Sequence, residues 1–164
     1  MKAIRLGPPV TGLLILTLAA LASALEPPRI IPSSGRAPQP PTQVFKTLKT
    51  YFSDPSLSKF QVIEANEAAK VIVAKQSGVD TTRWAEWAAC QTDPMHMLYQ
   101  FEDGTVTVKV TLDPSPGNAT FVTVRADFQG TYGLGQDTTT IACRSTGTLE
   151  QNILRVAGVP QPGN

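Results

Sequence analysis

The pattern of apolar and polar positions predicts a helix near the start of the folded region. Residues 42–54 carry apolar side chains at helical spacing, which gives the segment a single apolar stripe. Thr42 is a candidate N-cap, and Asp54 followed by Pro55 is expected to end the helix. The stripe consists of Val44, Phe45, Leu48, Tyr51 and Phe52.

Alternating and β-rich runs then predict antiparallel strands. Residues 59–65 and 69–76 are expected to form a hairpin around residues 66–68. The Asp103-Gly104 pair lies between two apolar runs and predicts a second hairpin turn. The remaining pattern gives strands at 105–112, 119–128 and 138–144, a turn at 113–118 and a Gly-rich loop at 130–137.

A second helix is predicted over residues 146–158, with Thr148 and Gln151 as a capping box. The fold class is therefore α+β. An antiparallel sheet of five to six strands would carry an N-terminal and a C-terminal helix in a two-layer sandwich. Residues 42–158 would form this single domain.

This order of elements resembles that of small exported domains of bacterial envelopes, including the helix-grip modules of the outer-membrane assembly lipoprotein BamC. The resemblance is one of element order over the folded domain, and it transfers no functional residue. It implies an accessory or scaffold role in the envelope. The chain departs from that family because no lipid-acceptor cysteine follows its apolar leader.

The leader predicts export. Lys2 and Arg5 precede an apolar run of about eleven residues, and Ala22-Ser23-Ala24 is a signal-peptidase site. Residues 1–24 are thus a predicted signal peptide cleaved after Ala24, with an uncleaved membrane anchor as the alternative. The expected location is the periplasm or the exterior.

Two further segments have the composition of disordered chain. Residues 25–41 contain six prolines and are expected to form a disordered linker, and residues 159–164 a disordered tail.

Removal of the leader leaves twelve cationic and thirteen acidic residues, so the mature chain is close to neutral. No basic cluster suggests a nucleic-acid partner, and no later segment is apolar for long enough to span a bilayer. Another envelope protein is the expected partner.

The segment around Cys90 contains most of the chemically distinctive residues. Export to an oxidising compartment predicts a disulfide between Cys90 and Cys143. Closing a loop of this length is worth about 4 kcal/mol in the chain-entropy model. Trp84 and Trp87 have helical spacing, but the run is too short to distinguish a helix from a strand.

A copper site is the main alternative for this segment. Met95, His96 and Met97 offer two thioethers and an imidazole, which suit Cu(I). A blue-copper centre is excluded because His96 is the only histidine, and a four-ligand zinc site has too few ligands. We therefore expect no cofactor, with copper handling as the alternative function.

Catalytic signatures are sparse. Cys90 with His96 is the one nucleophile pair to consider, and disulfide formation would remove it. The remaining route to an enzyme is a small hydrolase with an unrecognised carboxylate site, for which Glu64, Glu67, Glu102 and Asp103 are candidates.

The Gly-rich segment 130–137 predicts either simple flexibility at Gly130, Gly133 and Gly135, or a small binding loop of Tyr132, Gly133 and Gly135 with Tyr132 at its tip. With no catalytic set recognised, the sequence favours a non-catalytic, exported interaction or accessory module over an enzyme.

Overall fold

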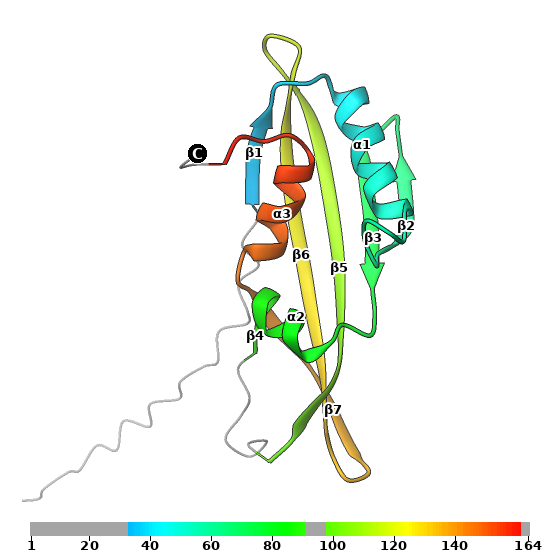
Figure 1. Ribbon diagram of the computed structural model, residues 1–164, viewed down its shortest axis with the longest axis vertical. Coiled ribbons are helices and arrows are strands. Elements are labelled where there is room, and N and C mark those ends of the chain that lie inside the picture. Colours follow the sequence, from blue (N-terminus) through cyan, green and yellow to red (C-terminus); the bar gives the residue numbers. More distant parts are fainter. Residues whose placement is uncertain (1–32, 91–97, 162–164) are drawn as a thin grey trace, which may run out of the picture.

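The computed structural model describes residues 33–90 and 98–161, which form one antiparallel sheet with three helices on one face (Figure 1). The elements, in chain order, are β1 (Ser33–Ala37), α1 (Pro41–Ser53), β2 (Gln61–Asn66), β3 (Val71–Gln76), α2 (Thr81–Trp87), β4 (Ala88–Ala89), β5 (Gln100–Ser115), β6 (Ala119–Leu134), β7 (Asp137–Ser145) and α3 (Thr148–Val156). The sheet has seven strands in the order β2-β3-β5-β6-β7-β4, and β1 pairs with β6 outside this path. The α+β class is thus confirmed, with one more strand than the upper expectation and one more helix.

The long hairpin of β5 and β6 forms the centre of the sheet, and both strands have sixteen residues. Every second residue is buried under the helices, and the opposite face carries mainly threonine and charged side chains. This alternation was predicted for 105–112, and the strand predicted at 119–128 shows it as well. The buried positions are Val106, Val108, Val110 and Leu112 on β5, and Val122, Val124, Ala126 and Phe128 on β6.

The predicted turn at Asp103-Gly104 is wrong, because both residues lie within β5. The register of β5 against β6 shifts between Phe101 and Asp103, so Glu102 is the extra residue of a β-bulge. The chain reverses between β5 and β6 at residues 116–118, and between β6 and β7 at residues 135–136. Gly135 has φ +65°, a left-handed conformation that glycine adopts without steric cost.

The N-terminal boundary of the fold also differs from the expected linker at 25–41. Ser33–Ala37 forms β1 and pairs antiparallel with residues 120–124 of β6. Beyond the other end of the predicted domain, Val159 lies so close to Gly35 that a Cβ there would overlap the valine side chain. Residues 33–37 and 159 are therefore packed structure rather than linker and tail.

The two predicted helices form where they were expected, as α1 and α3, but their ends differ. The segment around Trp84, which the periodicity left open, is helical as α2. Pro40 is the N-cap of α1, and Pro41 occupies the first helical position, where its missing N–H costs nothing. Gly147 precedes α3 with φ +86°, so Thr148 lies inside the helix rather than capping it. Asp80 caps α2 by accepting a hydrogen bond from the Arg83 N–H at 3.0 Å.

The core lies between the helices and the sheet. Its largest fully buried side chains include Phe52 and Leu48 of α1, Ile72 of β3 and Ile153 of α3. Within residues 33–90 and 98–161, no helix is both long and apolar enough to cross a bilayer.

Candidate functional site

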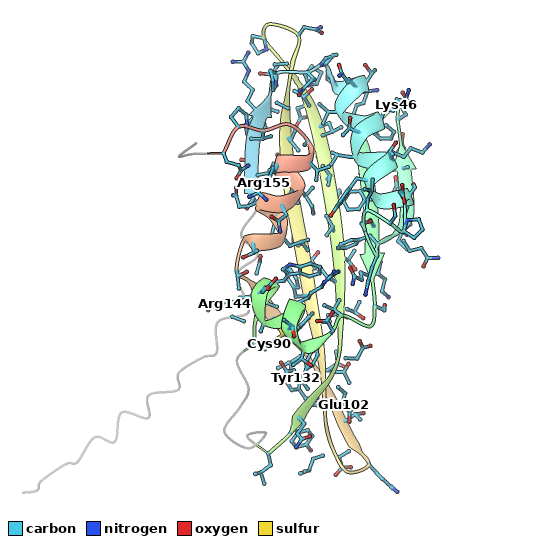
Figure 2. The ribbon with its side chains drawn as sticks, in the orientation of Figure 1. Lys46, Cys90, Glu102, Tyr132, Arg144 and Arg155 are labelled. Carbon is cyan, nitrogen blue, oxygen red and sulfur yellow. A yellow bond between two sulfur atoms is a disulfide. The ribbon has the colours of Figure 1, made fainter. Side chains whose placement is uncertain are left out.

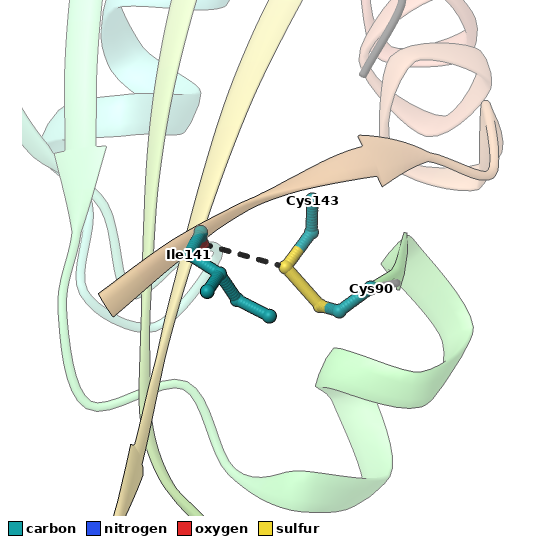
Figure 3. Close-up of a disulfide and its surroundings, with 3 residues drawn as sticks. All are labelled: Cys90, Ile141 and Cys143. Atoms are coloured by element: carbon teal, nitrogen blue, oxygen red, sulfur yellow. Dashed lines mark hydrogen bonds between the residues drawn. A yellow bond between two sulfur atoms is a disulfide. The ribbon is translucent and has the colours of Figure 1, made fainter. Parts of the chain in front are cut away.

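The structure contains the predicted disulfide between Cys90 and Cys143 (Figure 3). Cys143 lies on β7 and Cys90 directly follows β4, so the bond fixes the end of the α2–β4 segment to the sheet. In the disulfide state neither sulfur is a nucleophile or a soft metal ligand.

The Trp84 indole accounts for the presence of glycine at positions 104 and 130, which were predicted to lie in a turn and a loop. Gly104 of β5 and Gly130 of β6 are direct cross-strand partners, and the Trp84 indole lies over both. A Cβ on Gly130 would come within 3.1 Å of the indole, and one on Gly104 would overlap it. The ring also stacks on Phe101 at 5.3 Å and meets Phe128 edge-on at 5.8 Å between centroids.

The predicted binding loop of Tyr132, Gly133 and Gly135 is wrong in its geometry. Tyr132 and Gly133 are residues of β6, and Gly135 alone lies in the turn. The Tyr132 ring packs edge-on against Phe101 at 5.6 Å, and the Glu102 side chain lies over Gly133. Figure 2 shows Tyr132 and Glu102 near Cys90 at the α2 end of the molecule. This end of the molecule therefore holds an aromatic cluster of Trp84, Phe101, Phe128 and Tyr132 beside the Cys90–Cys143 disulfide. We call it the stapled end, and the disulfide its staple.

The other candidate residues do not gather. Met95, His96 and Met97 lie outside the described residues. In the part of the chain that the structure describes, no group of three or more His, Cys, Asp or Glu side chains is placed to hold a metal ion. The candidate carboxylates are dispersed, with Glu64 on β2, Glu67 in the β2–β3 turn, and Glu102 and Asp103 on β5.

The candidate functional site is instead an apolar groove between α1, α3 and the loop that follows α1. We call it the α1–α3 groove. Figure 1 shows the two helices beside one another over the sheet. The groove has a volume of about 580 Å³ and is open to solvent. Its lining residues are Lys46, Thr47, Thr50, Tyr51, Leu57 and Val156.

Leu57 projects into the solvent at this groove with 56% of its surface exposed. The loop that carries it is held in place by hydrogen bonds around Asp54. The Asp54 carboxylate accepts from the Ser56 N–H at 2.8 Å and from its hydroxyl at 2.6 Å, and the Asp54 carbonyl accepts from the Leu57 N–H at 3.0 Å. The Ser58 hydroxyl donates to the Tyr51 carbonyl at 2.9 Å. Leu57 is therefore an apolar side chain exposed by an ordered turn.

A single charged side chain, that of Lys46, lines the groove. Lys46 lines it from α1 (Figure 2), and none of its six lining residues is acidic. Burial raises the pKa of Tyr51, while the nearby Arg83 charge partly opposes this rise. Hydrogen bonds from Ser56 lower the pKa of Asp54, so this carboxylate is ionised. Its charge is already engaged in hydrogen bonds within the turn.

Comparisons with known proteins give little about function. No protein-family model matches the chain, and no curated protein matches it. A crystal structure of a DUF4468 family protein from Bacteroides ovatus is similar over 69% of this chain and 59% of that one, with 13% sequence identity and a TM-score of 0.38.

Leu57 has no signature in the sequence, because it stands alone between two serines in a loop. Asp54-Pro55 predicts the end of a helix, and the Asp-Pro-Ser pattern is also typical of a turn built on the aspartate side chain. That signal could have predicted an ordered loop. The groove itself required the knowledge that α1 and α3, far apart in sequence, are neighbours.

Proposed function

We propose that this protein is an exported, non-catalytic interaction module of the bacterial envelope. Its docking site is the α1–α3 groove, and the occupant is an apolar segment of another envelope protein that carries a carboxylate. The observation that carries this proposal is Leu57, a large apolar side chain held in solvent by an ordered turn. An apolar side chain that is preorganised in its bound position loses little conformational entropy on binding.

The location rests on the leader, and the disulfide is consistent with an oxidising compartment. The non-catalytic role is supported by the disulfide state of Cys90, which removes the nucleophile of the pair with His96.

The chemistry of the partner follows from the charge at the groove. Lys46 on its wall favours an acidic group beside the apolar contact. Two copies of this chain meeting groove to groove would bring their Lys46 side chains together, which disfavours a symmetric dimer through this face.

The proposal is tested by photocrosslinking in native bacterial envelopes, followed by reconstitution. A photoreactive residue replaces Leu57 in one variant and Leu134 in another, since both leucines are exposed, at 56% and 46%. The expected result is a specific crosslink from position 57 and none from position 134. The crosslinked protein is then purified, and its affinity is measured for the wild type, Leu57→Asp and Leu134→Asp.

We expect Leu57→Asp to weaken binding at least tenfold, as for a central apolar contact, and Leu134→Asp to leave it unchanged. Equal affinity of the partner for the two variants would show that the groove is not the docking site. Equal crosslinking at the two positions would show that neither surface is specific.

A further inference from the structure

Glu150 is a carboxylic acid in the first turn of α3 that has no exposed surface at all. Neither of its carboxyl oxygens has a hydrogen-bond partner of ordinary geometry among the described residues. An ionised carboxylate is costly to remove from water unless it is paired. The buried position therefore favours the neutral, protonated acid.

The junction that leads into α3 surrounds this group. Ser145 ends β7, and its hydroxyl oxygen accepts a hydrogen bond from the Gly147 N–H at 2.9 Å. Burial raises the pKa of Glu150, and the Ser145 hydroxyl and the backbone N–H of Glu150 itself oppose this rise. That hydroxyl does not complete a hydrogen bond of ordinary geometry to either carboxyl oxygen, so burial remains the larger effect.

The junction is also tied to α2. The Thr146 N–H donates to the Trp87 carbonyl at 2.9 Å, and the Thr146 hydroxyl donates to the Glu86 carbonyl at 2.6 Å. Movement of the first turn of α3 would therefore disturb the hydrogen bonds that Thr146 makes with the end of α2.

No charged side chain compensates Glu150 from the elements packed around it, since none contributes to its pKa shift. Arg144 directly precedes Ser145 in β7, so its side chain leaves the opposite face of the strand. Arg155 of α3 is exposed and donates to Asn152 at 2.9 Å. The charged residues of the other elements that contact α3 are all exposed: Lys46, Lys49, Arg83 and Glu86 of α1 and α2, Arg36 of β1, and Arg125 and Asp127 of β6.

We propose that Glu150 is an acid-sensitive latch for α3. In the closed state Glu150 is protonated and buried, and the first turn of α3 packs on the sheet. When Glu150 loses its proton, an open state becomes more favourable, in which this turn leaves the sheet and the carboxylate reaches water. Val156 of the same helix forms one wall of the α1–α3 groove. Low pH would therefore stabilise that wall, because it favours the closed state of α3. The latch itself does not depend on the proposed docking function.

The sign of the effect follows from linkage. A carboxyl whose pKa is higher in the closed state than in the open state binds more protons when closed. Closure is therefore strongest below the ordinary value of 4.5 and weakens as pH rises through the raised pKa. Each unit of difference changes the opening equilibrium about tenfold.

The test is hydrogen exchange measured by mass spectrometry on the full exported chain at pH 5 and pH 7.5, corrected for the intrinsic effect of pH on exchange. The segment compared is 148–157, in the wild type, Glu150→Gln and Glu86→Gln. Glu86 is the matched control because it is an exposed glutamate on α2.

We expect opening of 148–157 to increase several-fold from pH 5 to pH 7.5 in the wild type and in Glu86→Gln, and to be nearly independent of pH in Glu150→Gln. A pH dependence that persists in Glu150→Gln would overturn the proposal. If Glu150→Gln does not fold, an NMR titration of the wild-type Glu150 carboxyl carbon decides. A midpoint above 4.5 supports the latch, and a midpoint at or below it refutes it.

Discussion

Adding a single methyl group at Gly104 tests the packing of the stapled end. In Gly104→Ala the new Cβ would overlap the Trp84 indole, with Cζ3 at 2.7 Å. Trp84 cannot move aside easily, because it is 4% exposed and packs against Phe101 and Phe128. Overpacking of this kind costs about 1–3 kcal/mol, and the lower entropy of the unfolded alanine chain offsets about 0.4–1 kcal/mol. We expect a net destabilisation of about 1–2 kcal/mol.

The matched control is Gly133→Ala, also in the long hairpin. There the added methyl group would meet only the carboxylate end of Glu102, which is exposed and can rotate away. Its free energy of unfolding should stay within about 0.5 kcal/mol of the wild type. Both variants are compared by urea denaturation followed by tryptophan fluorescence and circular dichroism.

A double variant separates the clash from a backbone effect. Trp84→Leu removes the indole, so Gly104→Ala should cost much less in that background than in the wild type. Equal stability of Gly104→Ala and Gly133→Ala, or an undiminished cost of Gly104→Ala without the indole, would refute the packing of Trp84 on the glycine pair.

Three further predictions concern the staple, a buried hydrogen bond and the exposed turn. Replacing Cys90 and Cys143 with alanine should lower the free energy of unfolding by about 4 kcal/mol in urea denaturation, and a loss below about 1 kcal/mol would contradict the entropic account. Thr120→Val removes the 2.7 Å hydrogen bond to the Gln39 carbonyl and should cost about 1 kcal/mol in thermal unfolding; an unchanged midpoint would count against that bond. Asp54→Ala should speed amide exchange at residues 56–58. In the wild type the same loosening should appear as pH falls below 3.8, because a lowered pKa means that the ionised form stabilises the turn. Unchanged exchange in Asp54→Ala would contradict the role of this carboxylate.

Local patterns predicted the elements whose burial repeats along the chain. The stripe through Val44, Leu48 and Phe52 marked α1, and the alternation through Val106 and Val110 marked β5, because one face of each meets the core. The disulfide was predictable from the export signal and the cysteine count.

The predictions from glycine were wrong where the residue is required by a tertiary contact and not by a turn or a linker. Asp103-Gly104 has the local signature of a hairpin turn, yet Gly104 lies in a continuous strand beneath Trp84, about twenty residues earlier in the chain. Gly35 lies in a proline-rich stretch of linker-like composition, yet it accepts Val159 from the far end of the domain. Residue periodicity contains no information on such long-range contacts.

The α1–α3 groove could not be predicted for a related reason. Its lining comes from a helix, a loop and a second helix about a hundred residues later. Neither Leu57 nor Val156 is unusual in its local sequence. Their significance arises only when the fold places them beside one another.

The most direct test of the docking account is an NMR titration of the isotope-labelled protein with a synthetic peptide that spans the partner's crosslinked residue. The account predicts that chemical-shift changes concentrate on residues 46–57 and Val156, and that they disappear in Leu57→Asp but persist in Leu134→Asp. Changes centred on the helix-free face of the sheet, around Lys109 and Phe121, would contradict it.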